Sequence, residues 1–151
     1  MKAKEINEFK DVATKYCNLI DAHNSFKEET GIRDLLVTLS ALYTKALALP
    51  EVDSEGEEPL ELTVADPVIE FGNRDAYAMI FNPFQDKKPV TGLLSDDLSD
   101  IYTDLKRGLM LFEQGAQKQA VWEWKFHFEV HWGKHLTCAI HALHSIKYDD
   151  L

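Results

Sequence analysis

Two runs of apolar residues between positions 94 and 146 constrain the fold of this chain most. The apolar positions recur every three or four residues in each run, and Gly115 separates the runs. This spacing places the apolar side chains along one side of an α-helix. Ser95 suits the start of the first helix because its hydroxyl can accept from a free backbone N–H, and Gly115 suits its end because glycine adopts the left-handed conformation. We therefore predict two antiparallel helices joined at Gly115.

The second of these helices is apolar on most of its circumference. One broad sector holds Val121, Trp124, Phe128, Trp132, Ala139, Leu143 and Ile146, and other sides carry Trp122, Phe126, Leu136 and Ile140. Such a helix is typically central, with neighbours on several faces. We predict that Trp124 and Trp132 pack in the core. Trp122, with Phe126 one turn later, points away from the core sector and is the predicted partner surface.

The same periodicity appears twice in the N-terminal part, over residues 4–24 and 30–49. Pro50 ends the second run, because the residue before a proline avoids the helical region. Two helices joined by a short turn predict an antiparallel αα-hairpin.

The middle of the chain changes character. Residues 51–66 carry seven acidic residues and no Lys or Arg, which predicts a solvated acidic loop, with a short alternating run at 60–64 as a candidate strand. Helix is expected again over residues 66–81, capped by Asp66 and broken at Gly72. The predicted fold class is therefore all-α: a single domain over residues 1–151, an irregular helical bundle built on the N-terminal hairpin and the C-terminal antiparallel pair.

Charge and cysteine content exclude several classes of function. The chain has 151 residues and a net charge of −10, which disfavours binding to nucleic acid. No apolar run approaches the roughly 18 residues of a membrane span, and the N-terminus lacks a hydrophobic signal region, so we predict a cytoplasmic protein that does not enter membranes. Cys17 and Cys138 form no CxxC motif and are predicted to be reduced and buried. A disulfide between them, or a thiolate nucleophile, is the alternative.

Several motifs in the second half of the chain occur in an ordered series. They are residues 81–84 (FNPF), 89–98 (PVTGLLSDDL), 100–102 (DIY), 104–109 (DLKRGL), 120–126 (AVWEWKF) and 131–135 (HWGKH). This series resembles the bacterial family catalogued as domain of unknown function 5063. The resemblance covers the whole chain loosely and residues 81–144 closely. It implies an all-helical domain of about this length, and it implies no activity.

The histidines of the last helix are the candidate functional residues. His127, His131 and His135 are four residues apart, so their side chains stack along one side of a helix. Asp97, Asp100 and Asp104 follow a similar rhythm on the preceding helix. If the two helices pack together, the histidine row faces the aspartates.

This arrangement has a structural and a chemical interpretation. As a polar seam, the His–Asp contacts satisfy polar groups near the core and fix the helix register. As a metal site, two imidazoles four residues apart chelate one cation, either His127 with His131 or His131 with His135, and Asp97 or Asp100 completes the shell. All three histidines cannot easily reach one ion, because the outer two are about 12 Å apart along the helix axis. The HExxH motif and the Glu-x-x-His motif of di-iron bundles are absent from the sequence.

An enzyme using a His and an Asp for acid–base hydrolysis is the third interpretation. The sequence has no GxSxG elbow, P-loop or GxGxxG fingerprint to support it. We therefore predict a non-catalytic interaction or accessory domain without a cofactor. Its partner would be another protein or a second copy, in a homodimer formed through an apolar helix face. The alternative is a metal-binding protein or metal-dependent enzyme that uses His127, His131 and His135 with Asp97 and Asp100 to hold a divalent ion.

Overall fold

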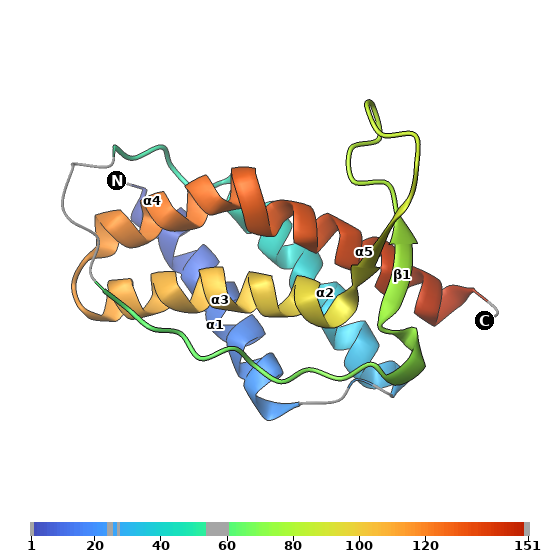
Figure 1. The fold of residues 1–151 in the computed structure, drawn as a ribbon. Helices are drawn as coiled ribbons and strands as arrows, with labels where there is room; N and C mark the ends of the chain where they lie inside the picture. Colours follow the sequence, from blue (N-terminus) through green and yellow to red (C-terminus); the bar gives the residue numbers. More distant parts are fainter. Residues whose placement is uncertain (1, 24–25, 27, 54–60, 150–151) are drawn as a thin grey trace.

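The computed structural model describes residues 2–23, 26, 28–53 and 61–149. Its helices are α1 (Ala3–Ala22), α2 (Glu29–Leu47), α3 (Leu94–Glu113), α4 (Gln117–His127) and α5 (Gly133–Tyr148). A short π-helical segment, η2 (Phe128–Trp132), joins α4 and α5 into one long rod (Figure 1). The predicted all-α class is confirmed in that the fold is mostly helical with an N-terminal helical hairpin, and it differs only by a small two-stranded sheet.

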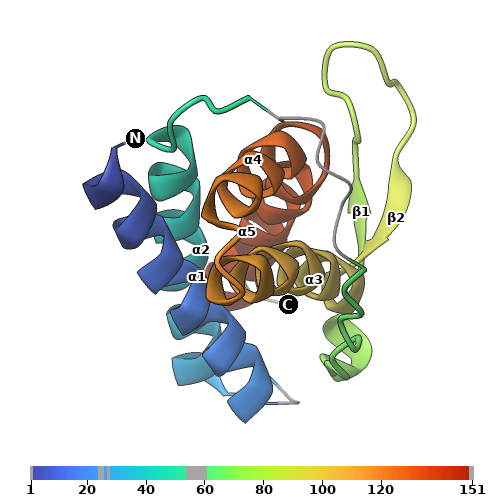
Figure 2. The same cartoon turned by 90° about the vertical axis from the view of Figure 1, so that its left-hand side faces the viewer.

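The elements form three layers. α1 and α2 lie side by side on one side of the molecule, the α4–α5 rod and α3 form the middle, and a small β-hairpin covers the far side (Figure 2). The two N-terminal helices face the middle layer with residues spaced three and four apart, as their sequence predicts. The buried apolar residues of this hairpin are Ile6, Phe9, Ala13, Tyr16, Cys17, Ile20, Ile32, Leu35, Leu39, Leu42 and Ala46.

Trp124 and Trp132 lie at the centre of the core, as predicted, and neither is exposed to solvent. The Trp124 indole N–H donates to the Leu105 carbonyl at 3.2 Å, and that of Trp132 donates to the Trp124 carbonyl at 3.0 Å. A methyl group at Gly108 would overlap the Trp124 indole, so only glycine lets α3 approach this ring so closely. The central position of the final rod is therefore fixed by these two buried rings and by one glycine opposite them.

The predicted helices over residues 66–81 are wrong. Residues 66–69 form neither helix nor strand, Gly72–Arg74 is a single 3₁₀ turn, and β1 (Ala76–Met79) is a strand. It pairs antiparallel with β2 (Val90–Leu93), with Tyr77 opposite Gly92. Burial along β1 alternates, which is the period of a strand lying with one face on the bundle.

The start of α3 is close to its predicted position, but its first turn is held by a different residue. The N-cap position is Leu93, where no side-chain capping bond forms. Asp75, just before β1, accepts hydrogen bonds from the Ser95 amide and the Ser95 hydroxyl, both at 2.7 Å. The end of α3 agrees with the prediction, because Gly115 has a φ of +87°. Asp75 therefore ties the β-hairpin to the N-terminus of α3.

Part of the predicted acidic loop, residues 54–60, lies outside the described residues, as do residues 24 and 25 at the predicted end of the first helix. On either side of that gap, residues 51–53 and 61–66 form neither helix nor strand, so the suggested strand is not formed by residues 61–64. A single domain over residues 1–151 stays a prediction. Among the described residues, no helix has the length and apolar character needed to cross a membrane.

Candidate functional site

Two histidines of the final rod face aspartates of α3. His131 Nδ1 lies 2.6 Å from Asp104 Oδ2, and His135 Nδ1 lies 2.8 Å from Asp97 Oδ1. Because a carboxylate can only accept, both Nδ1 atoms carry the hydrogen. The later histidine pairs with the earlier aspartate, as antiparallel helices require. Each ring is therefore fixed in orientation by its own carboxylate.

Asp100 lies between the two rings. Its Oδ2 is 3.1 Å from His135 Nε2 and 4.0 Å from His131 Nε2. The ligand atoms of these three residues all lie within 4.8 Å of one another, and all three side chains are partly exposed to solvent. We call Asp100, His131 and His135 the His–Asp triad. Both ring nitrogens of His135 face carboxylate oxygens, an arrangement that requires either a proton or a cation at Nε2.

Asp97 is the buried anchor of this site, with 4% of its surface exposed. Its Oδ1 accepts from His135 Nδ1, and its Oδ2 accepts from the Tyr77 hydroxyl of β1. Tyr77 reaches Asp97 across Gly92, where an added Cβ would lie 2.7 Å from the Tyr77 Cζ. With these two donors the buried carboxylate of Asp97 has its hydrogen bonds. Loss of either donor would destabilise the folded protein.

Tyr77 was not among the predicted site residues, because a helix was expected over its segment. The available signal was the alternation of small and large residues in Ala76, Tyr77, Ala78 and Met79, which is typical of a half-buried strand.

Hydrogen bonding and charge change the acidity of two groups in this site. The pKa of His135 is raised, first by its hydrogen bond to Asp97 and further by the charges of Asp100, Asp97 and Asp104, while burial opposes the shift. The pKa of the Tyr77 hydroxyl is also raised, mainly by burial and then by its hydrogen bond to Asp97. Tyr77 therefore remains a neutral donor, and His135 holds a proton more readily than a free histidine does.

The structure does not bring His127 to this cluster. Its Nδ1 lies 2.9 Å from the backbone carbonyl of Glu123, one turn earlier in its own helix. The π-helical segment that follows explains the difference, because a π turn contains more residues than an α turn. The four-residue spacing therefore does not keep His127 in line with His131 and His135. Of the predicted residues, the structure gathers Asp97, Asp100, Asp104, His131 and His135.

The remaining candidate residues lie elsewhere. Both cysteines are free thiols: Cys17 is buried, and burial raises its pKa to about 12, whereas Cys138 is only partly buried. The Trp122 and Phe126 rings are stacked 4.9 Å apart on α4, and Phe126 is 41% exposed.

These features define a mostly helical protein with a His–Asp cluster between two antiparallel helices. The chain matches the family model described as domain of unknown function (DUF5063) over residues 1–149, and it belongs to this family. It is also similar in fold to the crystal structure of protein BF1032 from Bacteroides fragilis, with a TM-score of 0.81 and 26% sequence identity. That similarity covers 98% of this chain and 95% of the other. A search of curated proteins finds no match.

Proposed function

We propose that this protein binds one divalent transition-metal ion at the His–Asp triad. The observation that carries the proposal is the orientation of the two imidazoles. Each donates Nδ1–H to its own carboxylate, Asp97 or Asp104, and each turns Nε2 toward Asp100. Histidines that bind metals commonly donate their second ring nitrogen to a carboxylate in this way, which fixes the tautomer and raises the basicity of the ligand.

The donor set also suits a transition metal. Two imidazoles and one carboxylate bind Zn²⁺, Mn²⁺ or Fe²⁺ and leave coordination positions open. Donors about 2.1 Å from a tetrahedral ion are about 3.4 Å apart, and the 3.1 Å between Asp100 Oδ2 and His135 Nε2 is close to this separation. The 4.0 Å separation from His131 Nε2 requires a small movement, which the partial exposure of Asp100 and His131 permits.

The negative charge of the cluster also favours a divalent cation. With neutral histidines, Asp97, Asp100 and Asp104 give the cluster three negative charges, and the described part of the chain places no Lys or Arg in an ion pair with them. A divalent cation would neutralise most of this charge. In the polar-seam interpretation, this negative charge is balanced instead by a proton. His135 would hold that proton between Asp97 and Asp100. Metal binding should therefore weaken at low pH, where protons compete for Nε2.

Calorimetric titration of chelator-treated protein with Zn²⁺, Mn²⁺ and Ni²⁺ tests the proposal. One equivalent of at least one metal should bind, and His131→Ala should reduce the affinity by about tenfold or more, the effect expected for loss of a metal ligand or its support. His127→Ala is the matched control, since it removes the same side chain from the same rod but from outside the triad. Absence of uptake, or an equal loss in the control, would contradict metal binding.

A protein-interaction function is the second candidate, and the stacked Trp122–Phe126 pair favours it. Phe126 is 41% exposed and its ring lies 4.9 Å from that of Trp122, so the pair presents apolar surface to solvent. Exposed apolar surface of this kind can associate with another protein or with a second copy of this chain. Light scattering over a concentration series should then detect a dimer that Phe126→Ser dissociates. A monodisperse monomer at the highest concentration would remove the homodimer.

A further inference from the structure

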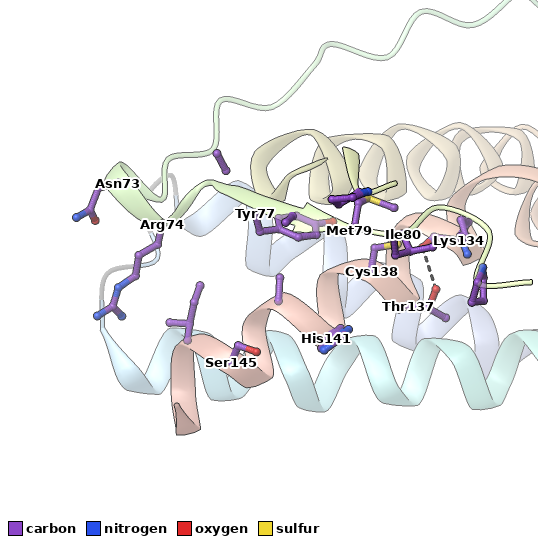
Figure 3. A pocket seen from close by; sticks show the side chains of 16 residues that line it. Asn73, Arg74, Tyr77, Met79, Ile80, Lys134, Thr137, Cys138, His141 and Ser145 are labelled. Atoms are coloured by element: carbon purple, nitrogen blue, oxygen red, sulfur yellow. Dashed lines mark hydrogen bonds between the residues drawn. The ribbon is translucent and has the colours of Figure 1, made fainter. Parts of the chain in front are cut away.

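A pocket on the outer side of α5 is separate from the His–Asp triad. It lies between the β-hairpin and α5 and has a volume of about 920 Å³ (Figure 3). This volume falls within the range of small-molecule sites, about 300–1,000 Å³. Its wall is largely apolar, with Met79, Ile80 and Ile146 among its lining residues. None of the triad residues lines it, although Tyr77, which donates to Asp97, forms part of its wall.

The charged side chains that line the pocket have the same sign. Within the part of the chain that the structure describes, these are Arg74 and Lys134, with His141 also in the wall, and no Asp or Glu lines it, although the chain carries 26 acidic and 16 basic residues. Figure 3 shows Arg74 and Lys134 toward opposite ends of the pocket, with His141 between them. Among the described residues, neither Arg74 nor Lys134 forms a salt bridge, and Lys134 Nζ lies instead 5.3 Å from the centre of the Phe81 ring. The basic groups are therefore available to an anion from outside the chain.

We propose that this pocket binds a small apolar carboxylate, a free molecule with an aliphatic body and one anionic end. The body would lie on Met79, Ile80 and Ile146, and the carboxylate would pair with Lys134 or Arg74. Apolar burial supplies most of the affinity in such a site, while a charge-assisted hydrogen bond fixes the orientation and selects the sign of the charge. A neutral or cationic molecule with the same body should bind more weakly.

Cys138 provides a reporter inside the pocket. It is one of the lining residues and is partly exposed, whereas Cys17, the other cysteine, is 1% exposed in the core. Burial raises the pKa of Cys138, so its reaction with an alkylating agent is best followed at mildly alkaline pH. A bound ligand should slow alkylation of Cys138 and leave Cys17 unchanged. Mass spectrometry of the two cysteine peptides separates the signals.

The experiment compares three ligands that share one chain: decanoate, decanol and decyltrimethylammonium. Decanoate should bind in calorimetry and protect Cys138, and the other two should bind about tenfold more weakly or not at all, the effect expected for a charge-assisted contact. The double variant Arg74→Glu/Lys134→Glu should lose this preference. Arg33→Glu/Lys15→Glu makes the same change of charge at exposed positions on α2 and α1, and should retain it.

Equal binding of the three ligands would overturn the proposal, as would equal loss of binding in both double variants or absence of Cys138 protection by decanoate. If raising the protein concentration alone protected Cys138, the pocket would be covered by a second copy, which would also overturn it. His131→Ala should bind decanoate normally, so failure of the metal site and failure of the pocket are distinguishable.

Discussion

At the scale of single residues, Asp97 holds the site together. It is buried, and it accepts one hydrogen bond from the β-hairpin and one from α5. A buried carboxylate that lacks hydrogen-bond donors strongly lowers the free energy of unfolding of a folded protein. The orientation of His135, and with it the geometry of the triad, therefore depends on Asp97 remaining fully hydrogen-bonded.

Tyr77→Phe tests this dependence. The change removes one donor to Asp97 and should lower the free energy of unfolding by about 1–3 kcal/mol, the effect of leaving a buried acceptor unsatisfied. Urea denaturation measures it. Tyr148→Phe is the matched control, because Tyr148 is 63% exposed and changes little on losing its hydroxyl. Equal stability of the two variants would show that Asp97 does not need Tyr77.

The raised pKa of His135 predicts how stability depends on pH. A histidine whose pKa is raised on folding contributes fully below the unfolded value of about 6.5, and its contribution is lost as the pH rises through the folded pKa. The free energy of unfolding of the metal-free protein should therefore fall as the pH rises above about 6.5. His135→Gln should flatten this fall, and His144→Gln, at an exposed position, should not. Parallel curves for all three proteins would contradict the His135–Asp97 contact.

The site was partly predictable from the residues alone. Helical spacing is enough to bring His131 and His135 opposite Asp97, Asp100 and Asp104 once two helices pack side by side. Helical spacing does not predict the position of His127, because a π turn lies between His127 and the other two histidines. The spacing of residues in the sequence does not predict a π turn. Tyr77 was missed for a different reason: its contact depends on a strand that packs across residues far away in the sequence.

At the scale of elements, the π turn sets the register of the rod. The Gly133 amide donates to the carbonyl of Phe128, five residues earlier, and an added Cβ at Gly133 would overlap that carbonyl oxygen. π turns within α-helices are frequent at functional sites. Here the turn lies between His127 and His135 and contains His131, so it decides which histidines face α3.

Gly133→Ala should therefore destabilise the protein. The added methyl group must displace the Phe128 backbone, and overpacking of this kind costs about 1–3 kcal/mol. Gly31→Ala is the control, since its Cβ would meet only the Phe26 ring at 3.4 Å, and alanine favours a helix. Urea denaturation compares the two variants. If Gly133→Ala proves as stable as Gly31→Ala, the π turn is not held by the lack of a side chain at position 133.

The sequence predicted the helices, but it did not predict the β-hairpin. α1, α2, α3 and the final rod each repeat an apolar pattern over many residues, so their existence could be predicted and their ends placed within a few residues. β1 and β2 are four residues each, and their stability comes from pairing with each other and from Tyr77 and Asp75 contacting α3. Short strands whose partners lie elsewhere in the chain carry little local signal.

At the scale of the whole molecule, the acidic character and the proposed metal are connected. A net charge of −10 destabilises the compact state through self-repulsion, and three of the acidic residues converge at one site. A bound cation would relieve part of this repulsion. The fold class could be predicted because most of the chain is helical, whereas the ligand depends on side-chain orientations that the sequence does not specify.

Metal should consequently stabilise the folded protein. A ligand that binds only the native state, at one hundred times its Kd, adds about 2.7 kcal/mol to the free energy of unfolding. Thermal unfolding of the chelator-treated protein should shift upward when the metal that binds in calorimetry is added. His131→Ala should lose the shift, and His127→Ala should keep it. An equal shift in both variants would point to binding at other groups.

The most direct measurement is an anomalous-difference map from crystals soaked in Zn²⁺ and measured at the zinc edge. One strong peak is expected about 2.0–2.2 Å from Nε2 of His131, Nε2 of His135 and a carboxylate oxygen of Asp100, the usual zinc–ligand distances. Nδ1 of each histidine should remain hydrogen-bonded to Asp104 or Asp97. A map with no peak at the triad, or with its peak at another histidine, would contradict metal binding by Asp100, His131 and His135.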